Sequence, residues 1–295
     1  DGTFAARKME CFSNQGAYAS HGHGIAAKGM GAFPQLYPCD NVQCDAYTVF
    51  TNKPVAGAMR GYGIPQAMFA GESHIEDVAR ALHMDSLAFR RKNMMPVGYV
   101  DGFSKNENYS DSLNQCIEKG MEYIGYERKQ AEYAKESGPV RHGVGMAIFW
   151  YNTAVWPISL ESSSCRMVLN QDGSVQLQMG ETEIGQGADT AFAQMAAETL
   201  GIPFKDVHVI STQDTDITPF GLGAYASRQT YIGGFSIKQT ALMMKERILK
   251  YAYELTRMPP FELDIVDGNI IRKNDARVLM SLGALATEAL YSLTH

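Results

Sequence analysis

The octapeptide Gly180–Gly187 constrains the possible fold more than any other stretch, because it joins a predicted β-hairpin to a predicted helix. Residues 167–179 alternate apolar and polar side chains on both sides of an Asp172-Gly173 turn, which is typical of a hairpin. From 188 to 199, apolar side chains repeat at helical spacing. Such a junction presents backbone N–H groups at the positive end of a helix, and glycine lets a ligand approach closely. A bulky anionic cofactor fits there, although an ordinary tight connection uses the same residues.

Composition excludes several classes of protein. With 45% apolar and 20% charged residues over 295 positions, the chain is ordinary globular material, enough for one large domain or two smaller ones. A net charge of −6 argues against a nucleic-acid surface, and no apolar run is long enough to span a membrane. Five cysteines without a CxxC pair suit a reducing cytoplasm and provide no zinc or iron–sulfur signature.

A second informative stretch is 58–66, which carries Arg60 among glycines and an aromatic residue. Pro65 suits the first turn of a helix that we expect to continue to about His83, and Asp85 is the predicted N-cap of the next helix. An arginine just before a helix N-terminus makes an electropositive spot, whereas the alternative is an arginine that caps a carbonyl group. The Gly61-x-Gly63 match is too short for a dinucleotide fingerprint.

Other candidate residues have structural alternatives. Residues 221–234 are rich in small side chains and lead into a long predicted helix, which makes a second place for an anion. Glu161 either faces a polar substrate or has a hydrogen-bonded structural role. His21 and His23 lie in a glycine-rich passage, 14–33, where no third metal ligand stands near, so we expect loop histidines.

The remaining periodicity predicts a mixture of strands and helices. One charged helix, interrupted by glycines, is expected over 112–137. Strands are expected over 3–12, 42–50, 144–151 and 207–210, with a final hairpin over 263–272 and a helix capped by Ser281.

Together, the two principal motifs resemble the molybdenum-hydroxylase family, the xanthine dehydrogenases and aldehyde oxidases. Residues 60–66 match the family's arginine-glycine-aromatic-glycine-x-proline-glutamine signature. Residues 180–187 match its glycine-x-threonine-glutamate-x-glycine-glutamine-glycine signature. Segments 75–93 and 224–234 are similar to further family segments in the same order. The resemblance covers nearly the whole chain, and it is strongest to the molybdenum subunits of bacterial xanthine dehydrogenases.

The resemblance implies an α+β fold of mixed sheets and packed helices that contains parts of two molybdopterin-binding domains. Residues 1–105 are expected as the C-terminal part of the first, 106–141 as a helical linker, and 142–295 as the N-terminal part of the second. The implied cofactor is molybdopterin, either without a nucleotide or as molybdopterin cytosine dinucleotide. It holds molybdenum through its dithiolene, so no residue ligates the metal directly.

The resemblance also implies an activity and partners. The reaction is hydroxylation of a purine such as hypoxanthine or xanthine with oxygen from water, and aldehydes or other N-heterocycles are alternative substrates. Electrons leave through iron–sulfur and FAD subunits or domains. The expected enzyme is a cytoplasmic oligomer that binds a small heterocyclic substrate and neither nucleic acid nor membrane.

Residue roles follow from motif positions. Arg60 is the implied catalytic residue, and Tyr62, which replaces the family's common phenylalanine, is the implied aromatic wall for the substrate. The implied cofactor contacts are Met59, Arg60, Gly185, Gln186, Gly187, Ala226, Ser227 and Gln229.

This sequence departs from the family pattern in two places. The family's catalytic glutamate, in a glycine-glutamate-proline-type motif, does not occur, and neither does the glutamine-bearing N-terminal portion. Glu181 and Glu183 belong to the cofactor motif and do not fill the catalytic role. Because the chain also opens on Asp1, we expect a central piece of a molybdenum subunit that, in isolation, lacks molybdenum and turnover. A non-catalytic scaffold is the alternative, and stoichiometric molybdenum in the protein would favour the enzyme instead.

Overall fold

Two parallel strands joined through a helix organise the first of two compact units, Asp1–Tyr151 and Asn152–His295. The computed structural model describes residues 1–102, 105–155, 161–210 and 214–292. Strand β1 (Arg7–Gly16) pairs with β2 (Val42–Phe50), and α1 (Gly22–Leu36) connects them. Exposed and less exposed side chains alternate along β1, as expected for a sheet covered on one face.

Helix α1 corrects the prediction of a glycine-rich loop over residues 14–33. Its glycines permit close packing, since a Cβ at Gly29 would lie 2.8 Å from the carbonyl oxygen of Gly63. Gly63 itself has φ +89°, and a Cβ there would lie 2.3 Å from the carbonyl oxygen of Ile25. Packing against the turn before the next helix therefore outweighs the low helix propensity of glycine.

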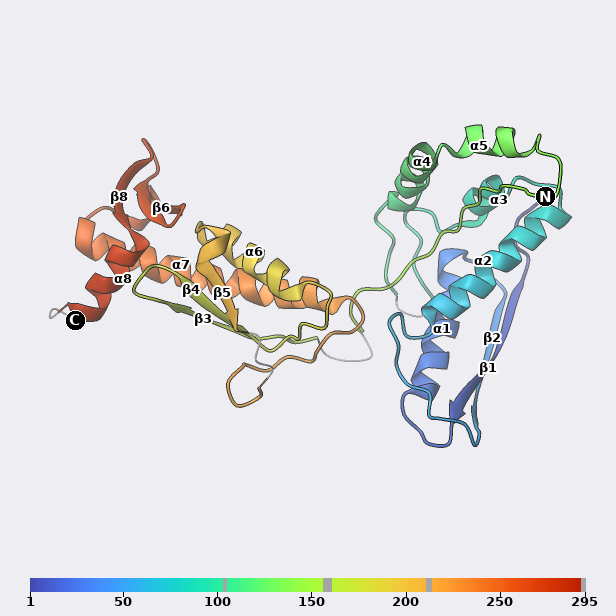
Figure 1. The fold of residues 1–295 in the computed structure, drawn as a ribbon, viewed down its shortest axis with the longest axis horizontal. Helices are drawn as coiled ribbons and strands as arrows, with labels where there is room; N and C mark the ends of the chain where they lie inside the picture. The colour runs from blue at the N-terminus through green and yellow to red at the C-terminus, as the bar shows by residue number, and fades with distance from the viewer. Residues whose placement is uncertain (103–104, 156–160, 211–213, 293–295) are drawn as a thin grey trace. The chain divides into compact units, whose positions relative to one another are not determined.

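The remaining helices of the first unit follow the sequence predictions closely. Helix α2 (Ile64–Ala81) has Pro65 in its first turn, and the Asp85 side chain caps α3 (Ser86–Asn93) by accepting the Ala88 N–H at 2.8 Å. The predicted helix over 112–137 is divided by Gly125 into α4 (Ser112–Ile124) and α5 (Tyr126–Tyr133). Helix α1 packs on the sheet and α2 packs against α1 (Figure 1).

A buried carboxylate, Glu72, organises the core of this unit. Its oxygens accept hydrogen bonds from the Tyr37 hydroxyl at 2.5 Å, from Arg90 Nε at 2.9 Å and from the Ile148 N–H at 2.9 Å. The side chain of Arg90 is 1% exposed and also contacts Glu76 at 3.3 Å. Helices α2 and α3 and the segment around residue 148 are thereby joined through one ionised group.

The segment 144–151 corrects a second prediction. It was predicted as a strand, yet it pairs as a strand with none of the described residues and packs within the compact unit Asp1–Tyr151. Met146, Ile148 and Trp150 pack against the first core, while Phe149 between them is 71% exposed. The apolar run that predicted a buried strand is therefore an extended segment that is buried on one side, against the first core and the carboxylate of Glu72.

The second unit combines a three-stranded mixed sheet with two long helices. Strands β3 (Cys165–Leu169) and β4 (Val175–Met179) form the predicted antiparallel hairpin, and β5 (Val207–Ile210) joins β4 in parallel after α6 (Ala188–Leu200). A π-helical turn, η2 (Gln229–Gly233), leads into α7 (Gly234–Thr256). Helices α6 and α7 pack together and cover the sheet (Figure 1).

A second, antiparallel sheet completes this unit. Strands β6 (Leu263–Val266) and β7 (Asn269–Arg272) form the predicted hairpin, β8 (Arg277–Ser281) adds to it, and α8 (Leu282–Tyr291) follows. The single-turn 3₁₀ helices are η1 (Phe204–Asp206) and η3 (Pro260–Glu262). The Ser281 hydroxyl caps α8 as predicted, at 3.1 Å from the Ala284 nitrogen. The α+β fold is thus confirmed, and no helix among the described residues is long and apolar enough to cross a membrane.

Replacing the arginine beside Glu72 should unfold the first unit preferentially. In Arg90→Met the buried carboxylate loses its cation, and we expect a loss of about 3–5 kcal/mol in the free energy of unfolding. Arg91→Met is the matched control, because Arg91 forms a surface ion pair with Glu118 that contributes at most ~1 kcal/mol. Urea denaturation of both variants measures the difference, and equal losses would contradict the role of Glu72.

Candidate functional site

The glycine loop between β4 and α6 is open to its surroundings. Gly185 and Gly187 have φ +97° and +85°, values that an L side chain adopts only with strain. A Cβ at either position would meet no heavy atom within 4 Å. Between them Gln186 is exposed, and Ile184 is 70% exposed. The glycines therefore serve the backbone conformation, and the space beside them is free for a flat or bulky group.

Glu183 accepts hydrogen bonds from the backbone of this loop. One carboxylate oxygen lies 2.6 Å from the Gly185 nitrogen and 3.1 Å from the Gly187 nitrogen, and the other lies 3.2 Å from the Asp189 nitrogen. The sequence predicted the amides of Gly185 and Gly187 as donors to the cofactor, and in this structure they bond Glu183. Their contact with the cofactor stays a prediction. The hydrogen bonds from Gly187 and Asp189 lower the pKa of Glu183.

Two glutamines predicted from separate motifs meet at one carbonyl group. Gln186 Nε2 donates to the Thr182 oxygen at 2.9 Å, and Gln229 Nε2 donates to the same oxygen at 2.8 Å. Gln186 Nε2 also donates to Gln229 Oε1 at 2.5 Å, while Gln186 Oε1 accepts the Ile184 N–H at 2.7 Å. The structure thus brings the glycine loop and the start of η2 together, as expected for residues that contact one ligand.

Arg228, the residue before Gln229, is a fully buried cation. It donates from Nη1 to both oxygens of Glu181, at 2.8 and 3.0 Å, and from Nε to Glu161 at 2.6 Å. Its guanidinium also donates to the carbonyl oxygens of Gly223 and Ser162. Burial acts to lower the pKa of Arg228, but the hydrogen bonds that its guanidinium donates to Glu161 and Glu181 outweigh this effect and raise that pKa. Of the two roles considered for Glu161, facing a polar substrate or forming structural hydrogen bonds, the structure shows the second.

The loop before η2 has an unusual backbone. Ala226 and Ser227 have φ +48° and +52°, a conformation that costs a non-glycine residue of order 1–3 kcal/mol. The Ala226 oxygen accepts a hydrogen bond from the Ala154 N–H at 2.7 Å, and Ser227 is exposed. Strained residues followed by a π-helical turn are frequent at functional sites.

In the first unit, the arginine motif forms the turn that precedes α2. Gly61, Tyr62 and Gly63 have φ +95°, +49° and +89° in succession. Arg60 and Met59 are exposed, and no described residue forms an ion pair with Arg60. That Arg60 converges on Gln186 stays a prediction.

Tyr62 has a partner that the sequence did not reveal. The His21 ring nitrogen Nδ1 lies 3.0 Å from the Tyr62 hydroxyl, and the two rings meet edge to face with centroids 5.8 Å apart. Gly24 makes room for this hydroxyl, since a Cβ there would lie 2.8 Å from it. His21 precedes α1 and does not belong to any cluster of metal ligands among the described residues. The hydroxyl of tyrosine, which distinguishes this sequence from its family pattern, is therefore held in place.

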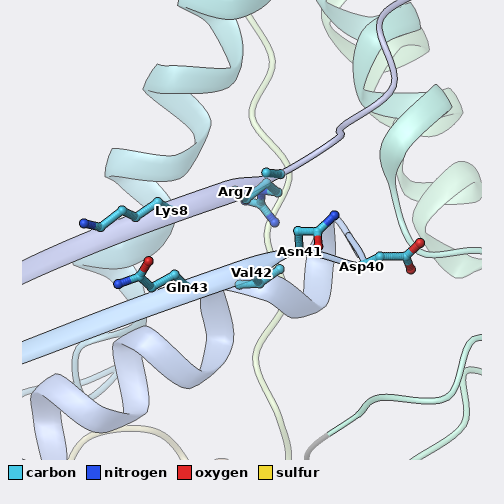
Figure 2. A pocket seen from close by; sticks show the side chains of 7 residues that line it. Arg7, Lys8, Asp40, Asn41, Val42 and Gln43 are labelled. Atoms are coloured by element: carbon cyan, nitrogen blue, oxygen red, sulfur yellow. The ribbon is translucent and has the colours of Figure 1, made fainter.

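A hollow of about 550 Å³ lies at the other end of the same sheet (Figure 2). It borders the starts of β1 and β2, whereas ligands of parallel sheets bind beyond the carboxyl ends of the strands. Arg7, the arginine in its lining, is engaged in structural contacts. Its guanidinium lies 4.0 Å from the Phe33 ring centroid and donates a hydrogen bond to the Tyr37 carbonyl oxygen. This hollow is therefore a weaker candidate. Its lining residues are Ala6, Arg7, Lys8, Asp40, Asn41, Val42 and Gln43.

The donor set of the second unit fits a pterin cofactor. The amides of Gln186 and Gln229 and the hydroxyl of Ser227 are uncharged groups that can pair with the edge of a heterocycle or with a phosphate. The open space beside Gly185 and Gly187 gives such a group access to the backbone.

Comparison with known proteins finds two matches to family models and several long relatives. Residues 119–294 match one molybdopterin cofactor-binding domain model, and residues 1–94 match another. The chain is 43% identical over 292 residues to a xanthine dehydrogenase molybdenum-binding subunit of Escherichia coli O157:H7, covering 99% of this chain and 39% of that protein. Xanthine dehydrogenase of Drosophila subobscura is 31% identical over 84% of this chain and 18% of its own length.

Among solved structures, quinoline 2-oxidoreductase from Pseudomonas putida 86 superposes with a TM-score of 0.83 at 25% identity. The match covers 99% of this chain and 38% of that one. The chain therefore spans about two fifths of the length of these bacterial relatives.

Replacing Arg228 by lysine tests the geometry of the buried cation rather than its charge. A single ammonium cannot bond both carboxylates and both carbonyl groups, so at least one charge-assisted hydrogen bond is lost, at a cost of ~1.5–3 kcal/mol. The exposed Arg247 on α7 gives the control Arg247→Lys, for which we expect a change within ~0.5 kcal/mol. Chemical denaturation checks both, and an unaffected Arg228→Lys variant would show that the fork geometry is dispensable.

Proposed function

We propose that this chain, which belongs to the molybdopterin cofactor-binding domain family, is the cofactor-binding part of an enzyme that hydroxylates purines with oxygen from water. The observation that carries the proposal is the meeting of Gln186 and Gln229 at Thr182, beside a glycine loop with open space. Hypoxanthine or xanthine is the proposed substrate, supported by 43% identity to the molybdenum-binding subunit of a xanthine dehydrogenase.

The proposed cofactor contacts come from both units. We assign the pterin and its phosphate to the glycine loop and the loop before η2, through side-chain amides, a hydroxyl and backbone groups. Bound through the pterin dithiolene, molybdenum supplies the redox chemistry that amino-acid side chains lack. The contact residues are Met59, Arg60, Gly185, Gln186, Gly187, Ala226, Ser227 and Gln229. Residues 1–105 and 142–295 are the proposed parts of two domains, with 106–141 as the linker.

Arg60 is the proposed catalytic residue. It is exposed in the turn before α2, and its guanidinium is a cation with several N–H donors. A fixed cation near a carbon under attack stabilises the negative charge that develops there. Tyr62 would orient a flat heterocycle by stacking, because its own ring is held by His21 and by the backbone of Gly61 and Gly63.

The proposed partners are iron–sulfur and FAD subunits or domains, which carry electrons away from the cofactor, within an oligomer. The cytoplasm is the proposed compartment, in keeping with five cysteines that all remain free thiols. A second candidate substrate class is other N-heterocycles, favoured by the TM-score of 0.83 with quinoline 2-oxidoreductase.

Removing the first glutamine should weaken cofactor retention more than substrate preference. In the assembled enzyme, Gln186→Ala loses contacts to the cofactor and to Gln229, which we expect to cost ~1.5–3 kcal/mol, or at least tenfold in affinity. Molybdenum per protein, measured by mass spectrometry, should fall accordingly. Gln194→Ala, on the exposed face of α6, is the matched control. Equal molybdenum content in the two variants would sink the proposed cofactor site.

Changing the tyrosine should have the opposite effect. Tyr62→Phe keeps the aromatic ring and removes the hydroxyl held by His21, so molybdenum content should remain while the ratio of kcat/KM between purines and aldehydes shifts by about tenfold, ~1.4 kcal/mol. Tyr18→Phe, at a residue that is 76% exposed, controls for a general effect of losing a hydroxyl. Unchanged discrimination would remove Tyr62 from the substrate site.

A further inference from the structure

Glu183 lies where the anionic part of a ligand would be expected, at the start of α6. Its two oxygens accept the N–H groups of Gly185, Gly187 and Asp189 at 2.6, 3.1 and 3.2 Å. The first amides of a helix lack partners within the helix, and the helix dipole adds positive potential there. A carboxylate of the chain itself thus satisfies donors on both sides of the junction between the loop and the helix.

The loop is largely exposed, so side-chain packing contributes little to its shape. Ile184 is 70% exposed, and the two glycines have no neighbour where a side chain would begin. The remaining support comes from Gln186, which bonds the Ile184 N–H and the Thr182 oxygen. The three hydrogen bonds that one carboxylate accepts therefore restrain a backbone that adopts positive φ twice.

We propose that Glu183 is a positioning residue for cofactor binding: an internal anion that completes the start of α6 and holds residues 184–187 so that Gln186 meets Gln229. The assignment of this loop to a cofactor rests on the proposed function. It follows that the phosphate of the cofactor is not received by the amides at the start of α6. Side-chain amides and the loop around Ser227 receive it instead.

The competing interpretation is that Glu183 is a placeholder which the phosphate displaces. The geometry favours the first interpretation, because the acceptor and its donors lie within six residues on one continuous segment. Displacement would require the carboxylate to leave all three hydrogen bonds. The lowered pKa of Glu183, caused by hydrogen bonds from Gly187 and Asp189, keeps the carboxylate ionised at neutral pH.

The first test uses the full 295-residue chain and is independent of any cofactor. Amide hydrogen exchange at Gly185, Gly187 and Asp189 should become at least tenfold faster in Glu183→Ala. Glu183→Gln, which keeps one acceptor oxygen, should restore part of the protection. Glu198→Ala, at an exposed position on the same helix, should leave these amides unchanged. Unchanged exchange in Glu183→Ala would overturn the proposal.

The second test uses the assembled enzyme and connects the loop to the cofactor. Molybdenum per protein should fall at least tenfold in Glu183→Ala, recover partly in Glu183→Gln, and stay constant in Glu198→Ala. If Glu183→Ala retains molybdenum while Gln186→Ala loses it, the inference about Glu183 fails and the proposed function stands. If both retain molybdenum, the proposed function fails as well.

A titration with inorganic phosphate separates the two interpretations of Glu183. Added to the full chain, phosphate should not protect the three amides in either the parent or Glu183→Ala. Tighter phosphate binding at these amides in Glu183→Ala, together with higher molybdenum content, would identify a displaceable placeholder and overturn the proposal.

Discussion

The ion pair between Arg228 and Glu181 is the contact on which the second unit's site depends. A guanidinium presents its donors in one rigid plane, so a single residue can join Glu181 after β4, Glu161 near β3 and the Gly223 carbonyl. Gln229 follows Arg228 directly, and Thr182 follows Glu181. The ion pair between Arg228 and Glu181 therefore also brings Gln229 close to the Thr182 carbonyl group, to which it donates a hydrogen bond.

Both units use a buried arginine in this way, since Arg90 and Glu72 hold the first unit as Arg228 and Glu181 hold the second. Such pairs add little stability compared with apolar residues of the same volume, because removing two charges from water is costly. Their effect is on the specificity of the fold, because a chain that packs without bringing the partners together leaves a buried charge unpaired. Each pair thus excludes alternative packings of the segments it joins.

Sequence periodicity and capping residues predicted the elements whose determinants are local. The hairpin at Asp172-Gly173, the Asp85 N-cap and the helix after Gly187 are of this kind, because the residues that decide them are neighbours. Helix α1 and the segment 144–151 were mispredicted, since contacts with distant residues decide both.

For the site, the motifs predicted that Gln186 and Gln229 bind one ligand, which stays a prediction, and the structure shows that the two side chains contact each other. Two contacts could be seen only in the folded structure. Arg228 and its partner Glu161 are 67 residues apart in sequence, and His21 and Tyr62 are 41 residues apart. The close approach of Gly63 to the Ile25 carbonyl has a mechanical consequence. Since a Cβ at Gly63 would lie 2.3 Å from that oxygen, the turn that carries Tyr62 packs against helix α1 with no room for a side chain between them. A substrate wall on this turn, as proposed for Tyr62, would select ligands by a shape that is already present, and a ligand that does not match it would bear the cost of distortion.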